Sequence, residues 1–262
     1  MQGMRDLSQR MLVRSNKHAG GEIMDKFNLY AAQMLSFNEQ FATKGHNACK
    51  GCGIALAVRQ VYKALENIVV NIENAKWDIP WQQNETVGSN KDKSKLSLLT
   101  IEKENGETLE ICFDNECSDN KIDNKNIIKR QPSIAAAGGC KYVATASPSH
   151  PFDLIDKIRS AYKSAGSAFV QILCPCPVAW DFDSENTVRL ARIAVEARVF
   201  PLYEIADGYY RLSAQENNPR TVNDYLSRQG RFTSWKKKKI DALQDEVNNS
   251  YDNLIEKSSK GL

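Results

Sequence analysis

Apolar residues recur every three or four positions in several stretches of the chain, which predicts amphipathic helices there. The longest of these stretches are 54–65, 151–162, 185–198 and 234–256. Short apolar runs between them have the composition of buried strands, namely 68–72, 142–146 and 168–173. This alternation of strand and helix favours an α/β fold with a mostly parallel sheet and helices on both faces.

The stretch 73–108 interrupts this pattern, because it is dense in Asn, Lys, Asp, Glu and Ser. Within it, Asn105-Gly106 is a strong turn signal, since both residues tolerate the positive φ of a type I′ turn. A strand-like run at 96–101 precedes this pair, and the alternating Leu109, Ile111 and Phe113 follow it. Local sequence therefore predicts a β-hairpin here, and Asp207-Gly208 predicts another over 202–212.

These patterns divide the chain into three parts. We expect an N-terminal arm over 1–44, an α/β domain over 45–215 that diverges at 73–133, and a C-terminal helical extension over 216–262. Pro151 fits the first turn of its helix, where the N–H that proline lacks has no partner in any case.

Composition excludes some classes of function. The chain has 262 residues, 42% apolar and 26% charged, with a net charge of +3, so we expect a globular protein and no nucleic-acid binder. No apolar run approaches the roughly 20 residues of a spanning helix, and the N-terminus lacks a secretory signal. We therefore expect a cytoplasmic protein that does not bind a membrane.

The chain has seven cysteines, a moderately high and odd number. In a cytoplasmic chain we expect them to be reduced thiols or metal ligands, because disulfides are rare there. Cys49-Lys-Gly-Cys52 brings two thiols within reach of one centre. It fits half of an iron–sulfur or zinc site, a redox dithiol, or two unligated thiols.

A second cysteine pair, in Cys174-Pro-Cys176-Pro, follows the strand at 168–173, where ligands bind in parallel sheets. It could supply the other half of a metal site, or be ordinary buried residues. His46 could act as an acid, a base, a polar contact to a bound group, or a structural residue.

At these residues the chain resembles a known family. The stretch GHNACKGCGIAL at 45–56 is similar to the opening motif of beta subunits of 2-oxoacid:ferredoxin oxidoreductases, above all the pyruvate type known as pyruvate synthase. Further similar stretches are YVATASPSHPFDLIDKIRSA, ILCPCPVAWDF, PLYEIADG and TVNDYLSRQGRF, in the family's order.

The resemblance implies a thiamine-diphosphate-binding fold, thiamine diphosphate with Mg²⁺, and a [4Fe-4S] cluster. It implies oxidative decarboxylation of a 2-oxoacid to acyl-coenzyme A, with electrons passed to ferredoxin, in a complex with alpha, gamma and delta-type subunits. Carried over by position, the cluster ligands are Cys49, Cys52 and Cys176. Asn115 then matches a magnesium ligand, Cys117 and Asn120 match cofactor contacts, and His46 lines the cofactor side.

The chain departs from the family in its centre, which we expect to be truncated or rewritten. The family's third cluster cysteine follows the strand at 68–72, but here the sequence runs VVNIENAKWDIPW. Cys140, Cys117 or Cys174 could replace it only if the fold brings one of them close. The family's Gly-Asp-Gly magnesium motif is also missing. Two alternatives therefore stay open: a non-catalytic relative that binds no thiamine diphosphate, and a small metal protein using Cys49, Cys52, Cys174 and Cys176.

Overall fold

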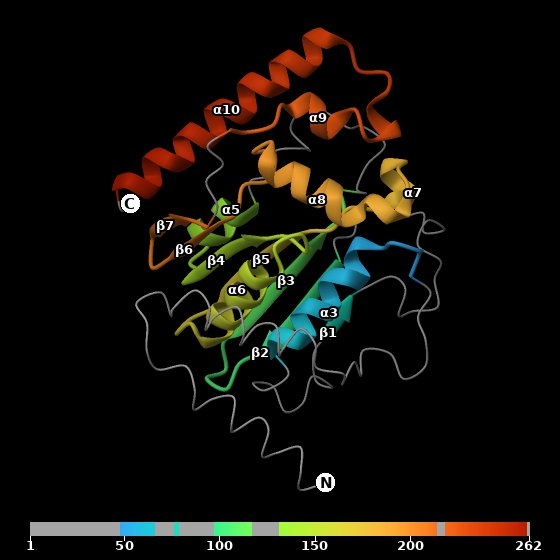
Figure 1. The fold of residues 1–262 in the computed structure, drawn as a ribbon. Helices are drawn as coiled ribbons and strands as arrows, with labels where there is room; N and C mark the ends of the chain where they lie inside the picture. The colour runs from blue at the N-terminus through green and yellow to red at the C-terminus, as the bar shows by residue number, and fades with distance from the viewer. Residues whose placement is uncertain (1–47, 66–75, 79–96, 117–130, 214–217, 261–262) are drawn as a thin grey trace, which may run out of the picture. The chain divides into compact units, whose positions relative to one another are not determined.

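The structure, a computed structural model, describes residues 48–65, 76–78, 97–116, 131–213 and 218–260. Its strands form a seven-stranded sheet in the spatial order β1-β2-β3-β5-β4-β6-β7 (Figure 1). The strands are β1 (Lys76–Asp78), β2 (Ser97–Glu102), β3 (Thr108–Asp114), β4 (Tyr142–Ala146), β5 (Ala168–Leu173), β6 (Tyr203–Ala206) and β7 (Tyr209–Leu212).

The centre of the sheet is parallel. Strands β3, β5 and β4 run in one direction, as do β1 and β7 at the edges, whereas β2 and β6 run the other way. Every residue of β4 is buried, as expected for a strand covered on both faces. The carboxyl ends of β3, β5 and β4 meet at one edge of the sheet, where ligands bind in folds of this kind.

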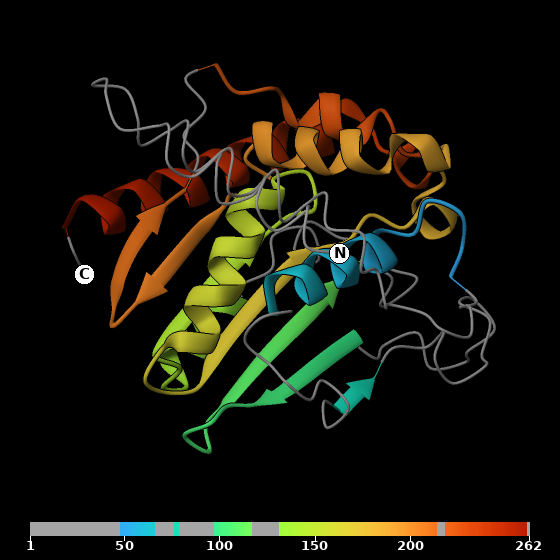
Figure 2. The same cartoon turned by 60° about the horizontal axis from the view of Figure 1, so that its bottom comes forward.

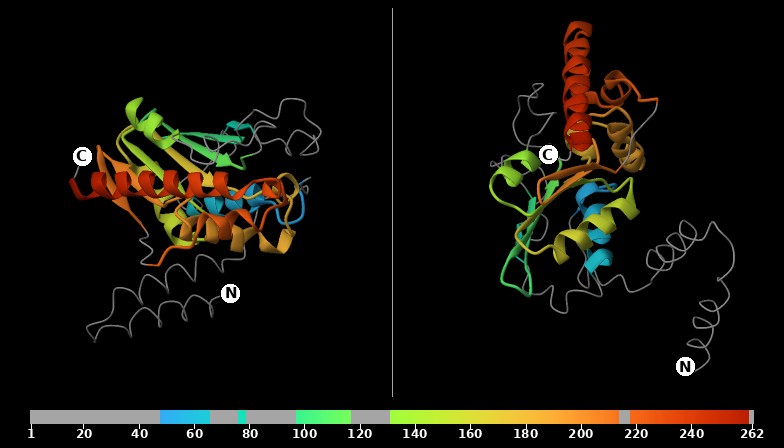
Figure 3. Two further views of the ribbon diagram at one scale, coloured as in Figure 1. Left: turned by 90° about the horizontal axis from the view of Figure 1, so that it is seen from above. Right: turned by 90° about the vertical axis from the view of Figure 1, so that its left-hand side faces the viewer.

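Helices cover both faces of the sheet, which confirms the predicted α/β class. Helices α3 and α6 lie side by side on one face (Figure 2), and α5 lies on the opposite face (Figure 3). Helix α10 packs on β7 and α9. The helices are α3 (Gly53–Leu65), α5 (Gln131–Ala137), α6 (Pro151–Lys163), α7 (Pro177–Trp180), α8 (Thr187–Glu196), α9 (Val222–Leu226) and α10 (Lys237–Lys260), with short 3₁₀ turns η3 (Ser184–Asn186) and η4 (Gly230–Phe232).

Most predicted helix faces are buried, but Phe152 of α6 and Val188 of α8, which is 42% exposed, are exceptions. Ile54, Val58, Val61 and Leu65 of α3 are buried as expected, and so are Ile155 and Ile158 of α6. Phe152 lies three residues before Ile155 and is expected on the same buried face of α6, but it is 36% exposed. At 3.6 residues per turn it lies about 120° around the helix from Ile158, so it points away from the sheet.

The first hairpin forms where the sequence predicts it, but with another turn. Only Gly106 of the Asn105-Gly106 pair takes a positive φ, 80°, so the type I′ expectation is wrong. The Asn105 side chain is used otherwise: its Oδ1 accepts a hydrogen bond from the Glu107 N–H at 3.1 Å, and its Nδ2 donates to the Ala165 carbonyl at 3.3 Å. At the second hairpin, Asp207 (49°) and Gly208 (87°) both take positive φ, as type I′ requires.

Strand β3 belongs both to this hairpin and to the parallel centre. It pairs antiparallel with β2 and parallel with β5. The local hairpin and the parallel strand that the resemblance implies are therefore compatible.

The C-terminal helices share one hydrophobic cluster with the loop that follows β5. Leu190 of α8, Val222 of α9 and Leu243 of α10 pack together with Trp180 and Cys176. In the part of the chain that the structure describes, no helix combines the length and apolarity needed to cross a membrane.

Candidate functional site

The two cysteine-rich loops lie against each other at the carboxyl end of β5. The Gly53 N–H, at the start of α3, donates a hydrogen bond to the Pro175 carbonyl at 3.2 Å. The Cys49–Cys52 turn closes on itself through a bond from the Cys52 N–H to the Cys49 carbonyl, 3.1 Å. Segments more than 120 residues apart in sequence are thus joined where parallel strands end.

Two glycines permit this close approach. A Cβ on Gly53 would lie 2.5 Å from the Pro175 carbonyl oxygen, and one on Gly51 would lie 2.3 Å from the carbonyl oxygen of Ser184. Gly51 also has a φ of 69°, which side chains other than glycine rarely adopt. Thr187 Oγ1, at the start of α8, donates to the Gly51 carbonyl at 2.6 Å, and this hydrogen bond holds the Cys49–Cys52 turn against α8.

The thiols in these loops influence one another electrostatically. Burial raises the pKa of Cys52, the N–H groups of Ala55 and Ile54 oppose that rise, and nearby Cys176 and Cys49 add to it. Cys174 is fully buried, which raises the pKa of its thiol well above the ordinary value, and Cys52 raises it further. Asp114 and Cys112 of β3 also raise the pKa of Cys174, so this thiol has neighbours in the sheet as well as in the two loops.

The remaining cysteines lie elsewhere or outside the described residues. Cys140 packs beside Val143 and Phe169 on the α5 face, with Glu110 and Lys103 as charged neighbours. Cys112 is buried in β3, and its Sγ contacts Gln131 Oε1 at 3.7 Å. Cys117 is not described. Of the three proposed substitutes for the third cluster cysteine, Cys174 lies in the loop that packs against the start of α3, and Cys140 lies on the α5 face.

The segment Asp114–Glu116 ends β3 next to these cysteines. The Cys174 N–H donates to the Asp114 carbonyl at 2.7 Å. The Asp114 carboxylate is almost fully buried, accepting from Gln171 Nε2 at 2.6 Å and from the Glu116 N–H at 3.0 Å. Asn115, the predicted magnesium ligand, follows directly. His46 and Asn120, like Cys117, lie outside the described residues.

Two residues that sequence reasoning missed hold this segment. Trp180 Nε1 donates to the Asn115 carbonyl at 2.7 Å, and Arg231 forms an ion pair with Glu116 at 2.7 Å. Arg231 also lies over the Trp180 ring, 3.9 Å from its centroid. Both residues lie inside stretches that resemble the family, ILCPCPVAWDF and TVNDYLSRQGRF, and this was the one sequence sign that they could matter. Nothing in the sequence indicates that either stretch contacts residue 116.

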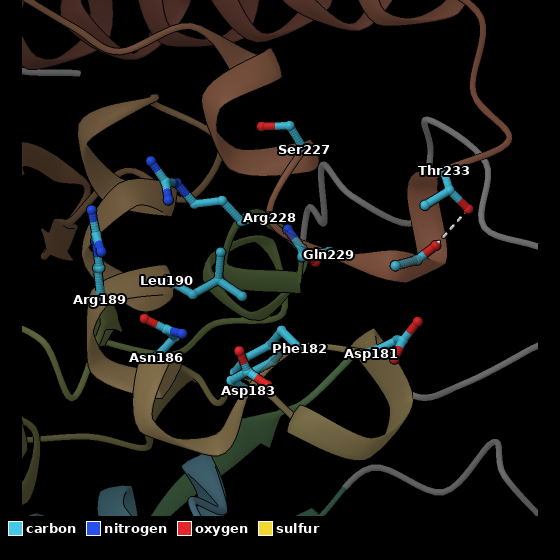
Figure 4. Close-up of a pocket in the computed structure, with 11 residues that line it drawn as sticks. Asp181, Phe182, Asp183, Asn186, Arg189, Leu190, Ser227, Arg228, Gln229 and Thr233 are labelled. Carbon is cyan, nitrogen blue, oxygen red and sulfur yellow. Dashed lines mark hydrogen bonds between the residues drawn. The ribbon is translucent and has the colours of Figure 1, made fainter.

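Two cavities in the described part of the chain are lined by residues outside the two cysteine loops. One, of about 620 Å³, opens between the segment after α7 and the segment after α9, and its lining includes Asp181, Asp183, Arg189 and Arg228 (Figure 4). The other, of about 480 Å³, is lined by Asp114, Gln171 and aromatic side chains from β6, β7 and α10. Among the described residues, no three His, Cys, Asp or Glu side chains are grouped so as to hold a metal ion.

Sequence comparison finds relatives along most of the chain, although no protein-family model matches it. The pyruvate synthase subunit PorB of Methanothermobacter marburgensis is 29% identical over 277 residues, covering 80% of this chain and 96% of the relative. PorB of Methanosarcina barkeri is 26% identical over 258 residues, covering 73% and 87%. The ketoisovalerate oxidoreductase subunit VorB of Pyrococcus horikoshii is 34% identical over 128 residues, covering 48% and 41%. Together with the α/β fold, these matches support a PorB-type beta subunit of a 2-oxoacid:ferredoxin oxidoreductase.

Proposed function

We propose that this subunit takes part in the oxidative decarboxylation of a 2-oxoacid, pyruvate first among the candidates, to acyl-coenzyme A with ferredoxin as electron acceptor. It would act with alpha, gamma and delta-type subunits of the same complex. One observation carries the proposal: the two cysteine loops and the Asp114–Glu116 segment lie together at the carboxyl end of β3 and β5. That edge is where α/β folds bind their ligands.

The donor set fits an iron–sulfur cluster. Cys49, Cys52 and Cys176 are the ligands that the family motif gives, and thiolates are what such clusters bind. We propose Cys174 as the fourth ligand, because it is the remaining cysteine of the loop that packs against the start of α3. A four-iron cluster takes one thiolate on each iron, so its ligands are spread more widely than those around a single ion.

The residues after β3 fit a magnesium-diphosphate site in part. The side chain of Asn115 would supply a hard oxygen ligand, which Mg²⁺ prefers, with Cys117 and Asn120 as further contacts and His46 on the cofactor side. When bound, thiamine diphosphate would supply the electron sink for decarboxylation and the cluster would accept single electrons. The Asp114 carboxylate helps to orient the segment, since its two oxygens accept hydrogen bonds from the Glu116 N–H and from Gln171 Nε2.

Calorimetry on the assembled complex tests this function. We expect saturable binding of thiamine diphosphate that requires Mg²⁺, and Asn115→Ala should weaken it by about tenfold or more because one metal ligand is lost. Asn248→Ala is the matched control, since Asn248 is exposed on α10 far along the chain from the site. No binding to the wild-type complex would reject the proposal.

A non-catalytic relative is the second candidate, and one observation favours it. Strand β2 joins β3 through a tight turn from Lys103 to Glu107, which leaves no room between these strands for the family's Gly-Asp-Gly motif. A complex that assembles with this subunit but neither binds thiamine diphosphate nor depends on Asn115 would support this candidate.

A further inference from the structure

The cavity of about 480 Å³ lies at the edge of the sheet where α/β folds bind their ligands. Asp114 ends β3, Gln171 lies near the end of β5 and Thr145 near the end of β4, and all three side chains line the cavity. Residues of α10, among them Ser250 and Tyr251, also line it. The volume lies within the range of roughly 300–1,000 Å³ that small-molecule sites have in proteins.

Four aromatic side chains line this cavity, namely those of Phe200, Tyr203, Tyr210 and Tyr251. Tyr203 and Tyr210 are stacked, with ring centroids 6.2 Å apart and planes inclined by 16°. Aromatic rings pack well against another flat apolar group, either offset-stacked or edge-on. The lining therefore favours a ligand that carries an aromatic ring.

Two cations in the lining lie over these tyrosine rings. The guanidinium carbon of Arg198 is 4.3 Å from the centroid of the Tyr251 ring, and Lys257 Nζ is 5.1 Å from that of Tyr210. Arg198 follows the C-terminus of α8 with a φ of 59°, a conformation that helix ends usually assign to glycine. Backbone strain in residues other than glycine gathers at binding sites, where it holds a side chain in place for a ligand.

The two acids in the lining are either offset by a cation or placed at the other end of the cavity. Glu116 forms its ion pair with Arg231 at 2.7 Å, and both side chains are almost fully buried. Asp114 lies at the β3 end of the lining, whereas Lys257 contacts β7, and β5, β4 and β6 lie between those two strands. The end of the cavity next to β7 and α10 therefore combines positive charge with aromatic rings.

We propose that this cavity binds a small aromatic carboxylate, with its ring among Phe200, Tyr203 and Tyr210 and its carboxylate on Arg198 and Lys257. A guanidinium can donate two parallel hydrogen bonds to one carboxylate, which fixes the orientation of the ligand. This proposal goes beyond the function proposed above and does not depend on it. Its test therefore needs neither thiamine diphosphate nor the other subunits.

Calorimetry on the purified full chain tests the chemistry of the site with phenylacetate as the probe. Three analogues separate its features: acetate lacks the ring, benzyl alcohol lacks the charge and benzylamine reverses it. We expect phenylacetate to bind with a Kd of about 1 mM or tighter, and each analogue to bind at least about tenfold more weakly. Benzylamine binding as tight as that of phenylacetate, or no saturable binding of phenylacetate, would overturn the proposal.

Two pairs of variants locate the probe in this cavity. Arg198→Gln should weaken phenylacetate binding by about tenfold, whereas Arg192→Gln, exposed on α8 and outside the lining, should leave the Kd unchanged. Ser250→Phe should fill the cavity from α10 and abolish binding, whereas Asn249→Phe, exposed on the same helix and outside the lining, should not.

Thermal unfolding of the same samples shows which variants are folded. If Arg198→Gln does not fold, the comparison of Ser250→Phe with Asn249→Phe still decides, because a wild-type Kd in Ser250→Phe places the probe outside the cavity. A wild-type Kd in both Arg198→Gln and Ser250→Phe would likewise overturn the proposal.

Discussion

Gly53→Ala should destabilise the protein, although alanine is the better helix former. Replacing a helical glycine by alanine normally gains about 1 kcal/mol. Here the new Cβ would lie 2.5 Å from the Pro175 carbonyl oxygen and 2.7 Å from the carbonyl carbon of Cys174, and backbone atoms cannot swing aside. The two loops would have to part by roughly 1 Å to restore normal contact distances.

The expected cost follows from that separation. Overpacking a tight site costs about 1–3 kcal/mol, and losing the bond from Gly53 to Pro175 costs about 1 kcal/mol more. After the helix gain, we expect the free energy of unfolding to fall by about 2 kcal/mol, a Tm drop of about 4–8 °C for a chain of this size.

Calorimetric unfolding of the purified protein measures this drop. Gly138→Ala is the matched control, because its Cβ would lie no nearer than 3.3 Å to any neighbour. We expect the control to stay within about 2 °C of wild type. A Gly53→Ala protein as stable as wild type, or more so, would refute the close contact between the two loops.

Three further predictions concern other parts of the fold. Burial lowers the pKa of His150 below its ordinary value of 6.5, so the unfolded chain takes up this proton more readily than the folded protein. Stability should therefore fall as the pH drops through 6.5. In measurements of Tm against pH, His150→Gln should reduce this fall. Lys103 Nζ donates to Ser164 Oγ and to the Ser164 and Gly166 carbonyls, so Lys103→Met should cost about 1–3 kcal/mol in denaturant unfolding, whereas exposed Lys163→Met should cost almost nothing. Gly208→Ala should cost only the strain of its 87° φ, about 1–2 kcal/mol in the same assay, because no atom lies within 4 Å of the added Cβ; a larger loss would mean that the hairpin packs differently.

Sequence patterns predict a helix or a turn well where interactions between neighbouring residues determine its structure. The helical spacing of 54–65 and the turn pair Asp207-Gly208 both give the observed structure, because periodicity and positive φ are properties of neighbouring residues. The turn at Asn105 is missed in detail because its side chain bonds to Ala165, in the loop between α6 and β5.

The site is less predictable, for the same reason. The strand-end rule places Cys174 and Cys176 at the ligand edge, but it does not say that α3 begins there too. The Arg231–Glu116 pair joins residues 115 positions apart, and neither residue type nor local spacing indicates it. Buried ion pairs of this kind become visible only once the chain is folded.

The central claim is that Cys49, Cys52 and Cys176, with Cys174, surround one inorganic centre. Iron and sulfide analysis of anaerobically purified wild type and of Cys52→Ser, Cys176→Ser and Cys140→Ser measures it most directly. We predict about four irons per chain in wild type and in Cys140→Ser, and loss of most of that iron in the other two. Full iron in Cys52→Ser and Cys176→Ser, or equal loss in all three variants, would contradict the account.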